Sequence, residues 1–291
     1  MAKKAKPISP IVAKIYKAFE ARAEDWRRQH LGASAIGRPC ERAVWYSYRW
    51  ASDPKFEGRI FRLFRRGQNE EPDVIEDLLA AGFEVTGGPA PGKQWRWSDL
   101  DGHFGGSMDG AIRGLPDDPD EWHVLEIKTH NKRSFEDLQK NSCPTSKPEH
   151  YAQMQVYMHL SGMQSALYLA VCKDDDRIHV ERYSYRSEFA GELMERARRI
   201  IGHTYPPPRI SDRPDYYICK WCDHYEVCHQ GSLPERNCRT CKSSAPIADA
   251  AWECRSGTVH SGLTRDHDGK IIISADRQKA PDCGGYEVCE T

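Results

Sequence analysis

Apolar residues recur every three or four positions in two stretches of the first third of the chain. The stretches 11–29 and 59–82 both show this spacing, which lines apolar side chains along one face of a helix. Between them, a loop leads into another short helix that begins at Cys40 or Glu41. The first third of the chain is therefore predicted to be helical.

Beyond Phe83 the hydrophobic period shortens towards two, which is typical of β-strands, and Gly, Pro and Asp clusters separate the segments. The predicted strands form a meander over residues 83–87, 93–97, 103–113 and 122–130. Helical spacing returns at 134–141, 149–162 and 188–203, with strands at 165–175 and 177–185. This order predicts an α/β fold in which helices flank a mixed sheet.

The proline run at 206–208 closes this core, and the segment after Ser211 is short-patterned, loop-like and rich in cysteine. A chain of 291 residues can bury a full α/β core and still carry a small module. We therefore predict a main domain over residues 1–232 and a small cysteine-rich tail over residues 233–291.

Composition narrows the class of protein. The mean hydropathy is -0.74 and no long apolar run is present, so we expect a soluble, cytoplasmic protein without a membrane span. The net charge of -1 gives no overall nucleic-acid signature. One stretch is nevertheless basic, and it is either a solvated helix face or the lining of a local DNA groove; its members are Lys55, Arg59, Arg62, Arg65 and Arg66.

Glu126 and Lys128 are two residues apart on a predicted strand, so their side chains share one face while Ile127 points into the packing. Asp109 lies on the preceding strand and would come beside Glu126 if the two strands pair. Two carboxylates and the carbonyl of Ile127 form a partial shell for a hard divalent cation such as Mg²⁺. Lys128 would then orient the attacking water or help to deprotonate it, and would offset charge on the scissile phosphate. An ordinary solvent-facing ion pair is the alternative for Glu126 and Lys128.

These motifs, taken in order, resemble the RecB-like branch of the PD-(D/E)XK nuclease superfamily, which includes phage and CRISPR-associated exonucleases. The matching segments are GSMDG, LEIK and a helix that carries Gln153 and Tyr157, within residues 30 to 230. The branch also has an upstream acidic residue after a helical glycine. Gly67 and Glu71 match it, with Glu70 as a second choice.

The resemblance implies a restriction-endonuclease-like fold and Mg²⁺- or Mn²⁺-dependent hydrolysis of DNA, with exonuclease activity favoured. It places Asp109, Glu126, Lys128 and Glu71 in the catalytic and metal-binding centre. Gln153 and Tyr157 would contact DNA or help to position that centre. DNA with a free end or a single strand would be the substrate, in phage or prokaryotic recombination, repair or processing, and a recombination or replication protein is a possible partner.

Eleven cysteines in a cytoplasmic chain point to metal coordination more than to disulfides. The same nuclease branch contains members in which one N-terminal and three C-terminal cysteines hold a [4Fe–4S] cluster. This chain offers the same arrangement, and zinc or simple buried thiols are the alternatives. The four residues are Cys40, Cys219, Cys222 and Cys228.

A second set of cysteines in the tail is suited to one tetrahedral zinc ion in a ribbon-like module. The set is Cys238, Cys241, Cys254 and Cys283, with Cys289 able to replace Cys283. We expect this tail to fold independently of catalysis. Cys172 lies in an apolar strand and is predicted to be a core residue.

Two further interpretations belong to other functional classes. The chain could be a non-catalytic DNA-binding or replisome-scaffold protein that keeps the nuclease fold, or a zinc-ribbon interaction protein. The joint presence of Asp109, Glu126, Lys128 and Gln153 favours the enzyme. Trp95 and Trp97 alternate on a strand and either stack on bases or pack the sheet.

Overall fold

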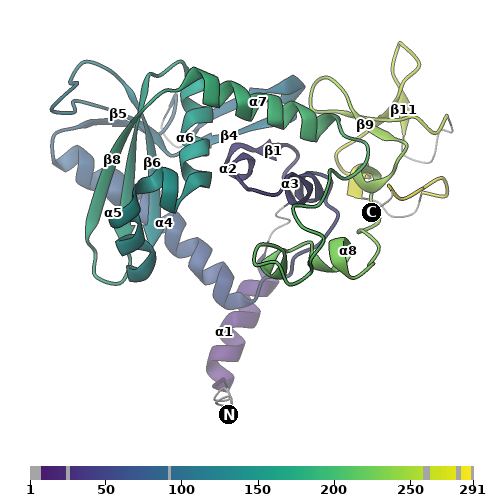
Figure 1. Cartoon of the computed structure of the whole chain (residues 1–291), viewed down its shortest axis with the longest axis horizontal. Coiled ribbons are helices and arrows are strands. Elements are labelled where there is room, and N and C mark those ends of the chain that lie inside the picture. Colours follow the sequence, from purple (N-terminus) through teal and green to yellow (C-terminus); the bar gives the residue numbers. More distant parts are fainter. Residues whose placement is uncertain (1–7, 24–26, 91–92, 258–262, 280–282, 290–291) are drawn as a thin grey trace.

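A five-stranded mixed sheet forms the centre of the computed structural model, which describes residues 8–23, 27–90, 93–257, 263–279 and 283–289. The strand order is β2-β5-β6-β7-β8, and only the β6–β7 pair is parallel. Helices cover both faces of this sheet (Figure 1). The predicted α/β core with a mixed sheet is therefore confirmed.

The elements of the main body follow the chain in the order that the hydrophobic pattern predicts. Its helices are α1 (Pro10–Ala21), α2 (Ala33–Ile36), α3 (Glu41–Tyr48), α4 (Gly58–Ala80), α5 (Lys132–Ser146), α6 (Pro148–Ser161), α7 (Ser187–Gly202) and α8 (Tyr225–His229). Its strands are β1 (Leu31–Gly32), β2 (Glu84–Thr86), β3 (Trp95–Asp99), β4 (Phe104–Met108), β5 (Gly110–Arg113), β6 (His123–His130), β7 (Ser165–Cys172) and β8 (Ile178–Ser184).

Successive side chains of β6 pack on opposite faces of the sheet. Leu125 and Ile127 pack into an apolar cluster with Val74 of α4, on one face. Val124 belongs to the larger core that α5, α6 and α7 cover on the other face. Because side chains alternate along a strand, Glu126 and Lys128 share the face of Val124. Cys172 is fully buried in β7, which confirms its assignment to the core.

The predicted meander is wrong at one point. The segment 103–113 is not one strand: the chain breaks at Asp109, so β4 and β5 belong to different sheets. β4 pairs with β1 and β3 in a separate three-stranded sheet, while β5 pairs with β2 and β6. The short β1 and α2 were not predicted, because four or fewer residues carry no measurable period.

The first predicted helix ends earlier than expected, at Ala21. α1 and the first half of α4 pack together and project from the body as an arm (Figure 1). α1 buries none of its side chains fully, consistent with this exposed position. No described helix is long and apolar enough to cross a membrane.

The cysteine-rich tail has more structure than its loop-like sequence predicts. It holds a small antiparallel sheet in the order β11-β12-β10-β9. Its strands are β9 (Ser244–Pro246), β10 (Trp252–Cys254), β11 (Thr264–Arg265) and β12 (Ile271–Ile273). Short 3₁₀ turns lie in the main body, at Leu100–Gly102 and Cys219–Trp221, and in the tail, at Cys238–Thr240 and Arg277–Lys279. Trp252 and Ile273 belong to the same apolar core as the main body, so the tail is packed against it.

Candidate active site

Strand pairing brings the two candidate carboxylates together. β5 runs antiparallel to β6 with Gly110 opposite Leu125, so Asp109 arrives beside Glu126. The amide of Ile127 donates a hydrogen bond of 2.9 Å to Oδ2 of Asp109. The backbone of β6 therefore holds Asp109 at the point where the chain passes from β4 to β5.

Lys128 lies between the two carboxylates. Its Nζ donates to Oδ2 of Asp109 at 3.3 Å and to the carbonyl of Ile127 at 3.0 Å, and it forms a close ion pair with Glu126. Burial lowers the pKa of Lys128, but the charges of Glu126 and Asp109 outweigh it and the net shift is upward. Lys128 is therefore a charged donor at neutral pH, not a base.

Glu126 is the most unusual group of this cluster. Its side chain is 0% exposed, and its carboxylate is held in the ion pair with Lys128. Burial raises its pKa to about 8, with Lys128 opposing the shift and Asp109 adding to it. A buried carboxylate is costly unless it is paired, and Lys128 supplies the positive charge that pairs with Glu126.

The structure separates the two upstream acidic candidates. Burial and the charge of Asp109 raise the pKa of Glu71, so these carboxylates are electrostatic neighbours. Glu71 also contributes to the upward shift of Glu126. Glu70 lies instead in a groove with the arginines of α4. Three carboxyl groups thus lie near the ammonium group of Lys128.

Gln153 and Tyr157 lie one turn apart on α6 and both line the same hollow as Asp109 and Lys128. The hydroxyl of Tyr157 donates to the carbonyl of Ser107 at 2.7 Å. The Tyr157 ring is only 2% exposed, so it cannot stack on a base. A Cβ at Gly106 would lie 2.6 Å from the Tyr157 hydroxyl, so the glycine makes room for this bond. Tyr157 positions β4.

The hollow above the carboxylates is a cleft of about 750 Å³. One wall comes from β3 and β4, including Arg96, Trp97 and Gly105, and another from the segment 28–34. Trp95 and Trp97 of β3 stack with their ring centroids 6.4 Å apart, and Trp97 lines the cleft. Sequence patterns gave no reason to select Arg28, His30 or Arg96, because isolated residues outside a periodic element carry no signal.

A second hollow of about 230 Å³ adjoins the cleft and shares Arg28, His30 and Ser34 with it. It leads past Arg38 and Phe56 to His224. Burial and the neighbouring charges of Arg28, Arg239 and Arg96 lower the pKa of His30. Arg28, Arg38 and Arg96 thus give the two hollows cationic side chains, beside the acidic Asp223 in the smaller one.

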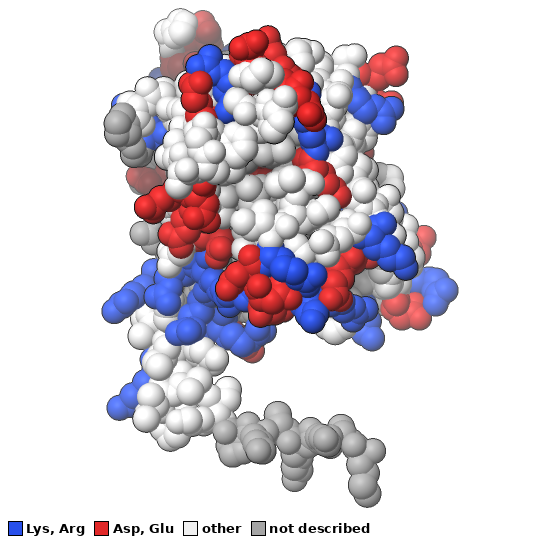
Figure 2. Space-filling view, turned by 90° about the vertical axis from the view of Figure 1, so that its left-hand side faces the viewer, with Lys and Arg blue, Asp and Glu red and all other residues white. Residues whose placement is uncertain are grey.

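Basic side chains also gather where the arm of α1 and α4 joins the body (Figure 2). A groove of about 400 Å³ on α4 is lined by Arg59, Arg62, Arg65, Arg66 and Glu70, among others. Arg62 and Arg65 lie over the ring of Phe19 in α1. Most of the predicted basic stretch thus faces solvent on one exposed helix.

The first set of four cysteines comes together although its members are far apart in sequence. Cys40, Cys219, Cys222 and Cys228 line one small cavity next to α3 and α8. Cys40 is the N-cap residue of α3. Burial raises the pKa of the Cys219 thiol, with further upward effects from Cys228 and Cys40.

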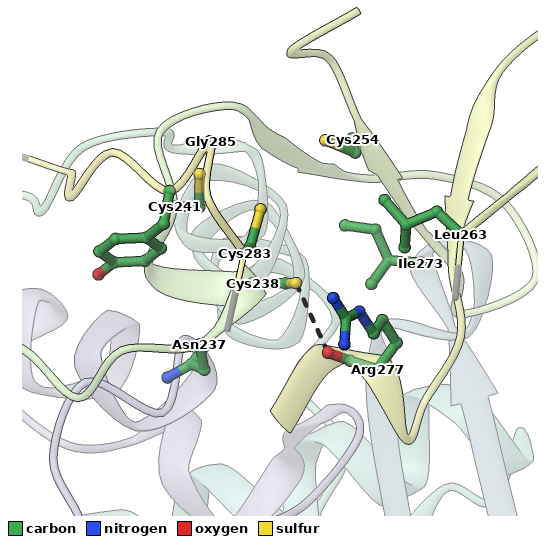
Figure 3. Close-up of a pocket in the computed structure, with 10 residues that line it drawn as sticks. Asn237, Cys238, Cys241, Cys254, Leu263, Ile273, Arg277, Cys283 and Gly285 are labelled. Carbon is green, nitrogen blue, oxygen red and sulfur yellow. Dashed lines mark hydrogen bonds between the residues drawn. The ribbon is translucent and has the colours of Figure 1, made fainter. Parts of the chain in front are cut away.

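The second set also lines one cavity, in the tail (Figure 3). Burial raises the pKa of Cys238 to about 11, and Cys283, Cys241 and Cys254 add to the shift. The thiol of Cys254 lies 3.1 Å from the hydroxyl of Ser256. Cys289 does not line this cavity; its thiol donates to the carbonyl of Thr240. Within the described ranges, no three His, Cys, Asp or Glu side chains are gathered closely enough to hold a metal ion.

No protein-family model matches the sequence, and no curated protein matches it. Among solved structures, the chain is similar to an alkaline exonuclease (LHK-Exo) from Laribacter hongkongensis, alone and in complex with dAMP. Both matches have 20% identity and a TM-score of 0.44, and cover 63% of this chain and 90% of that chain. It is also similar to SSO0001, at 16% identity and a TM-score of 0.43, over 76% of this chain and 96% of that chain. Similarity at this level establishes neither a family nor an activity.

Proposed function

We propose that this protein is a metal-dependent deoxyribonuclease of the PD-(D/E)XK type, with a centre formed by Asp109, Glu126, Lys128 and Glu71. One observation carries the proposal. Glu126 is fully buried and paired with Lys128, and Lys128 and Asp109 line a cleft that also carries Arg28 and Arg96. A core that only needed stability would not retain such a group.

A divalent cation fits this centre. Mg²⁺ prefers carboxylate oxygens, keeps several waters and uses one or two carboxylates together with substrate phosphates, so it does not require a ready-made cage of three side chains. Asp109, Glu126 and the Ile127 carbonyl would hold Mg²⁺ or Mn²⁺, with Glu71 completing the shell. When bound, the ion would polarise the scissile phosphate and activate water.

The protein's own groups have distinct tasks in this proposal. Lys128, held by Asp109 and Glu126, donates to the attacking water and offsets charge on the phosphate. Gln153 lines the cleft and orients the substrate. Tyr157 fixes β4 through Ser107, which keeps the wall opposite Lys128 in place.

The cleft geometry supports action on a free end or a single strand. Asp109 and Lys128 line the cleft, whereas the Glu126 side chain beside them has no exposed surface. The adjoining hollow continues past Arg28 and Arg38. A single strand can follow this path with its phosphates on the arginines and a base against Trp97, without sequence-specific contacts.

We further propose that the two cysteine sets hold metal centres. Cys40, Cys219, Cys222 and Cys228 would bind a [4Fe–4S] cluster, with zinc as the alternative, and tie the N-terminal helices to the segment after the core. Cys238, Cys241, Cys254 and Cys283 would bind zinc once the Cys254 side chain turns from Ser256 towards the cavity.

The decisive experiment incubates purified protein with end-labelled linear DNA, a linear single strand or a closed single-stranded circle, with and without Mg²⁺ or Mn²⁺. The measurement is the rate at which each substrate is cut. We expect the linear substrates to be degraded only with metal. Metal-dependent cutting of the circle at the rate of the linear strand would show an endonuclease. DNA binding without cutting under every metal condition would leave the non-catalytic DNA-binding protein.

A further inference from the structure

Arg239 lies in the tail between Cys238 and Cys241, and its side chain is 0% exposed. Its guanidinium donates only to neutral oxygens among the described residues: the carbonyls of Tyr48 and Gln29 and the side-chain amides of Gln29 and Gln278, all at 2.8–3.0 Å. Burial lowers its pKa to about 9, which still leaves it charged at neutral pH. A buried charge without a carboxylate partner is costly, so a specific role is expected.

Aromatic rings of the main body and of the tail supply the remaining stabilisation. Arg239 lies 3.9 Å from the ring centroid of Trp50 and 4.9 Å from that of Trp252. Trp50 directly follows the C-cap of α3 and has φ of 56°, a left-handed conformation that costs a bulky residue energy. In this conformation the Trp50 ring lies against the Arg239 guanidinium.

The hydrogen bonds of Arg239 also reach a residue that lines the cleft. Gln29, which accepts two of the hydrogen bonds from Arg239, lies between Arg28 and His30, and all three residues line the cleft. β1 begins at Leu31, whose amide donates to the carbonyl of His103 at 2.8 Å. The segment 28–32 is thus held by the tail at one end and by β4 at the other.

A second contact joins the tail to the opposite wall of the cleft. The hydroxyl of Tyr48 donates to Nδ1 of His103, which leaves Nε2 of His103 to donate to the carbonyl of Ile247 at 2.7 Å. The amide of Ala250 donates to the carbonyl of Asp101 at 2.7 Å. Both contacts hold the turn that leads into β4, a strand that lines the cleft.

From these contacts we infer that the tail is a brace for the DNA cleft and that Arg239 is its positioning residue. It fixes the wall that presents Arg28 and His30, without touching Asp109, Glu126 or Lys128. The expected consequence, tighter DNA binding, rests on the proposed function. It replaces the expectation that the tail is dispensable for cleavage.

The test compares Arg239→Lys with Gln278→Met in the full-length protein. Both variants remove hydrogen bonds of the same buried guanidinium, but only Arg239→Lys disturbs those to Gln29. Hydrogen exchange of the segment 27–34 is measured by mass spectrometry, together with the Kd for a labelled single strand without added Mg²⁺ or Mn²⁺. We expect Arg239→Lys to speed exchange in 27–34 and weaken DNA binding about tenfold, with Gln278→Met leaving both unchanged.

Gln29→Met keeps the test decisive if Arg239→Lys does not fold, because it removes one bond from the cleft side of the same contact. Faster exchange in 27–34 for this variant supports the brace. Unchanged exchange in 27–34 for both Arg239→Lys and Gln29→Met would overturn it. Wild-type protein that neither binds nor cuts DNA would refute the proposed function, while the exchange data would still decide the brace.

Discussion

The amide of Ile127 binds the carboxylate of Asp109, so the residue between Glu126 and Lys128 fixes the position of their third partner. This bond depends on the break between β4 and β5, which turns Asp109 away from the ladder and towards β6. The proposed centre is consequently a property of two strand ends and not of one motif.

Replacing Lys128 by Ala should lower the rate of DNA cleavage by about a thousandfold, because the variant loses the charge that faces the water and the phosphate. Asp109→Asn should have an effect of similar size. Single-turnover rates at saturating Mg²⁺ measure both. Lys132→Ala, at an exposed position outside the cleft, is the control. Metal-dependent cutting at the wild-type rate in Lys128→Ala would refute the proposed centre.

Tyr157→Phe removes the hydroxyl that donates to the carbonyl of Ser107 and that also interacts with Gln153. We expect a loss of about 1 kcal/mol in the free energy of unfolding and a lower kcat with little change in KM, because β4 shifts relative to Lys128. Tyr185→Phe loses a comparable bond to His159 on the surface and should leave kcat unchanged. Equal kcat values for the two variants would contradict a positioning role.

Arg59→Ala and Arg62→Ala test whether the groove on α4 contacts the phosphate backbone. Each lost phosphate contact should weaken DNA binding and reduce the slope of log Kd against log salt by about 0.9. Fluorescence anisotropy over a salt series gives this slope. Arg198→Ala, in an exposed ion pair on α7, should leave it unchanged. A constant slope in the α4 variants would show that the groove is an ordinary solvated helix face.

The buried His150 makes the stability of the fold depend on pH. Its Nδ1 lies 2.7 Å from the hydroxyl of Tyr168, and burial, followed by the charges of Lys128, His130 and Lys147, lowers its pKa to about 3. The unfolded chain binds a proton near pH 6.5 and the folded chain does not, so stability falls as pH decreases from about 6.5 towards 3.

His150→Gln, which cannot titrate, should therefore lose less stability than the wild type over this range. Urea unfolding at pH 7 and pH 5 measures the difference, with His267→Gln at an exposed position as the control. Parallel losses in wild type and His150→Gln would show that another group causes the acid sensitivity.

Removing one cysteine of the first set should remove its metal centre. Anaerobically purified wild-type protein is expected to contain iron and to absorb broadly in the visible range, whereas Cys40→Ser should lose both. Cys143→Ser, at a buried cysteine that lines neither cavity, should retain them. Zinc in place of iron would keep the site and change the metal; wild-type protein free of both metals would refute the site.

Local sequence was sufficient for most elements and for the central motif. Apolar alternation around Glu126 predicts a strand with both functional side chains on one face, because successive residues of a strand point to opposite sides. The three-and-four spacing around Val74 and Gln153 predicts α4 and α6 for the same geometric reason. The sequence could not show the break at Asp109, since the residues on both sides of it favour strands equally.

Local patterns along the chain therefore predict the order of most elements and the groups that one strand or one helix places together. The folded arrangement shows in addition that Glu71 and not Glu70 joins the carboxylates, and that Arg28 and Arg96 line the cleft. It also decided the contact of Arg239 with Gln29, across 210 positions. Side-chain periodicity is a local property, whereas a buried charge is stabilised by whichever distant oxygens and rings the packed chain brings to it.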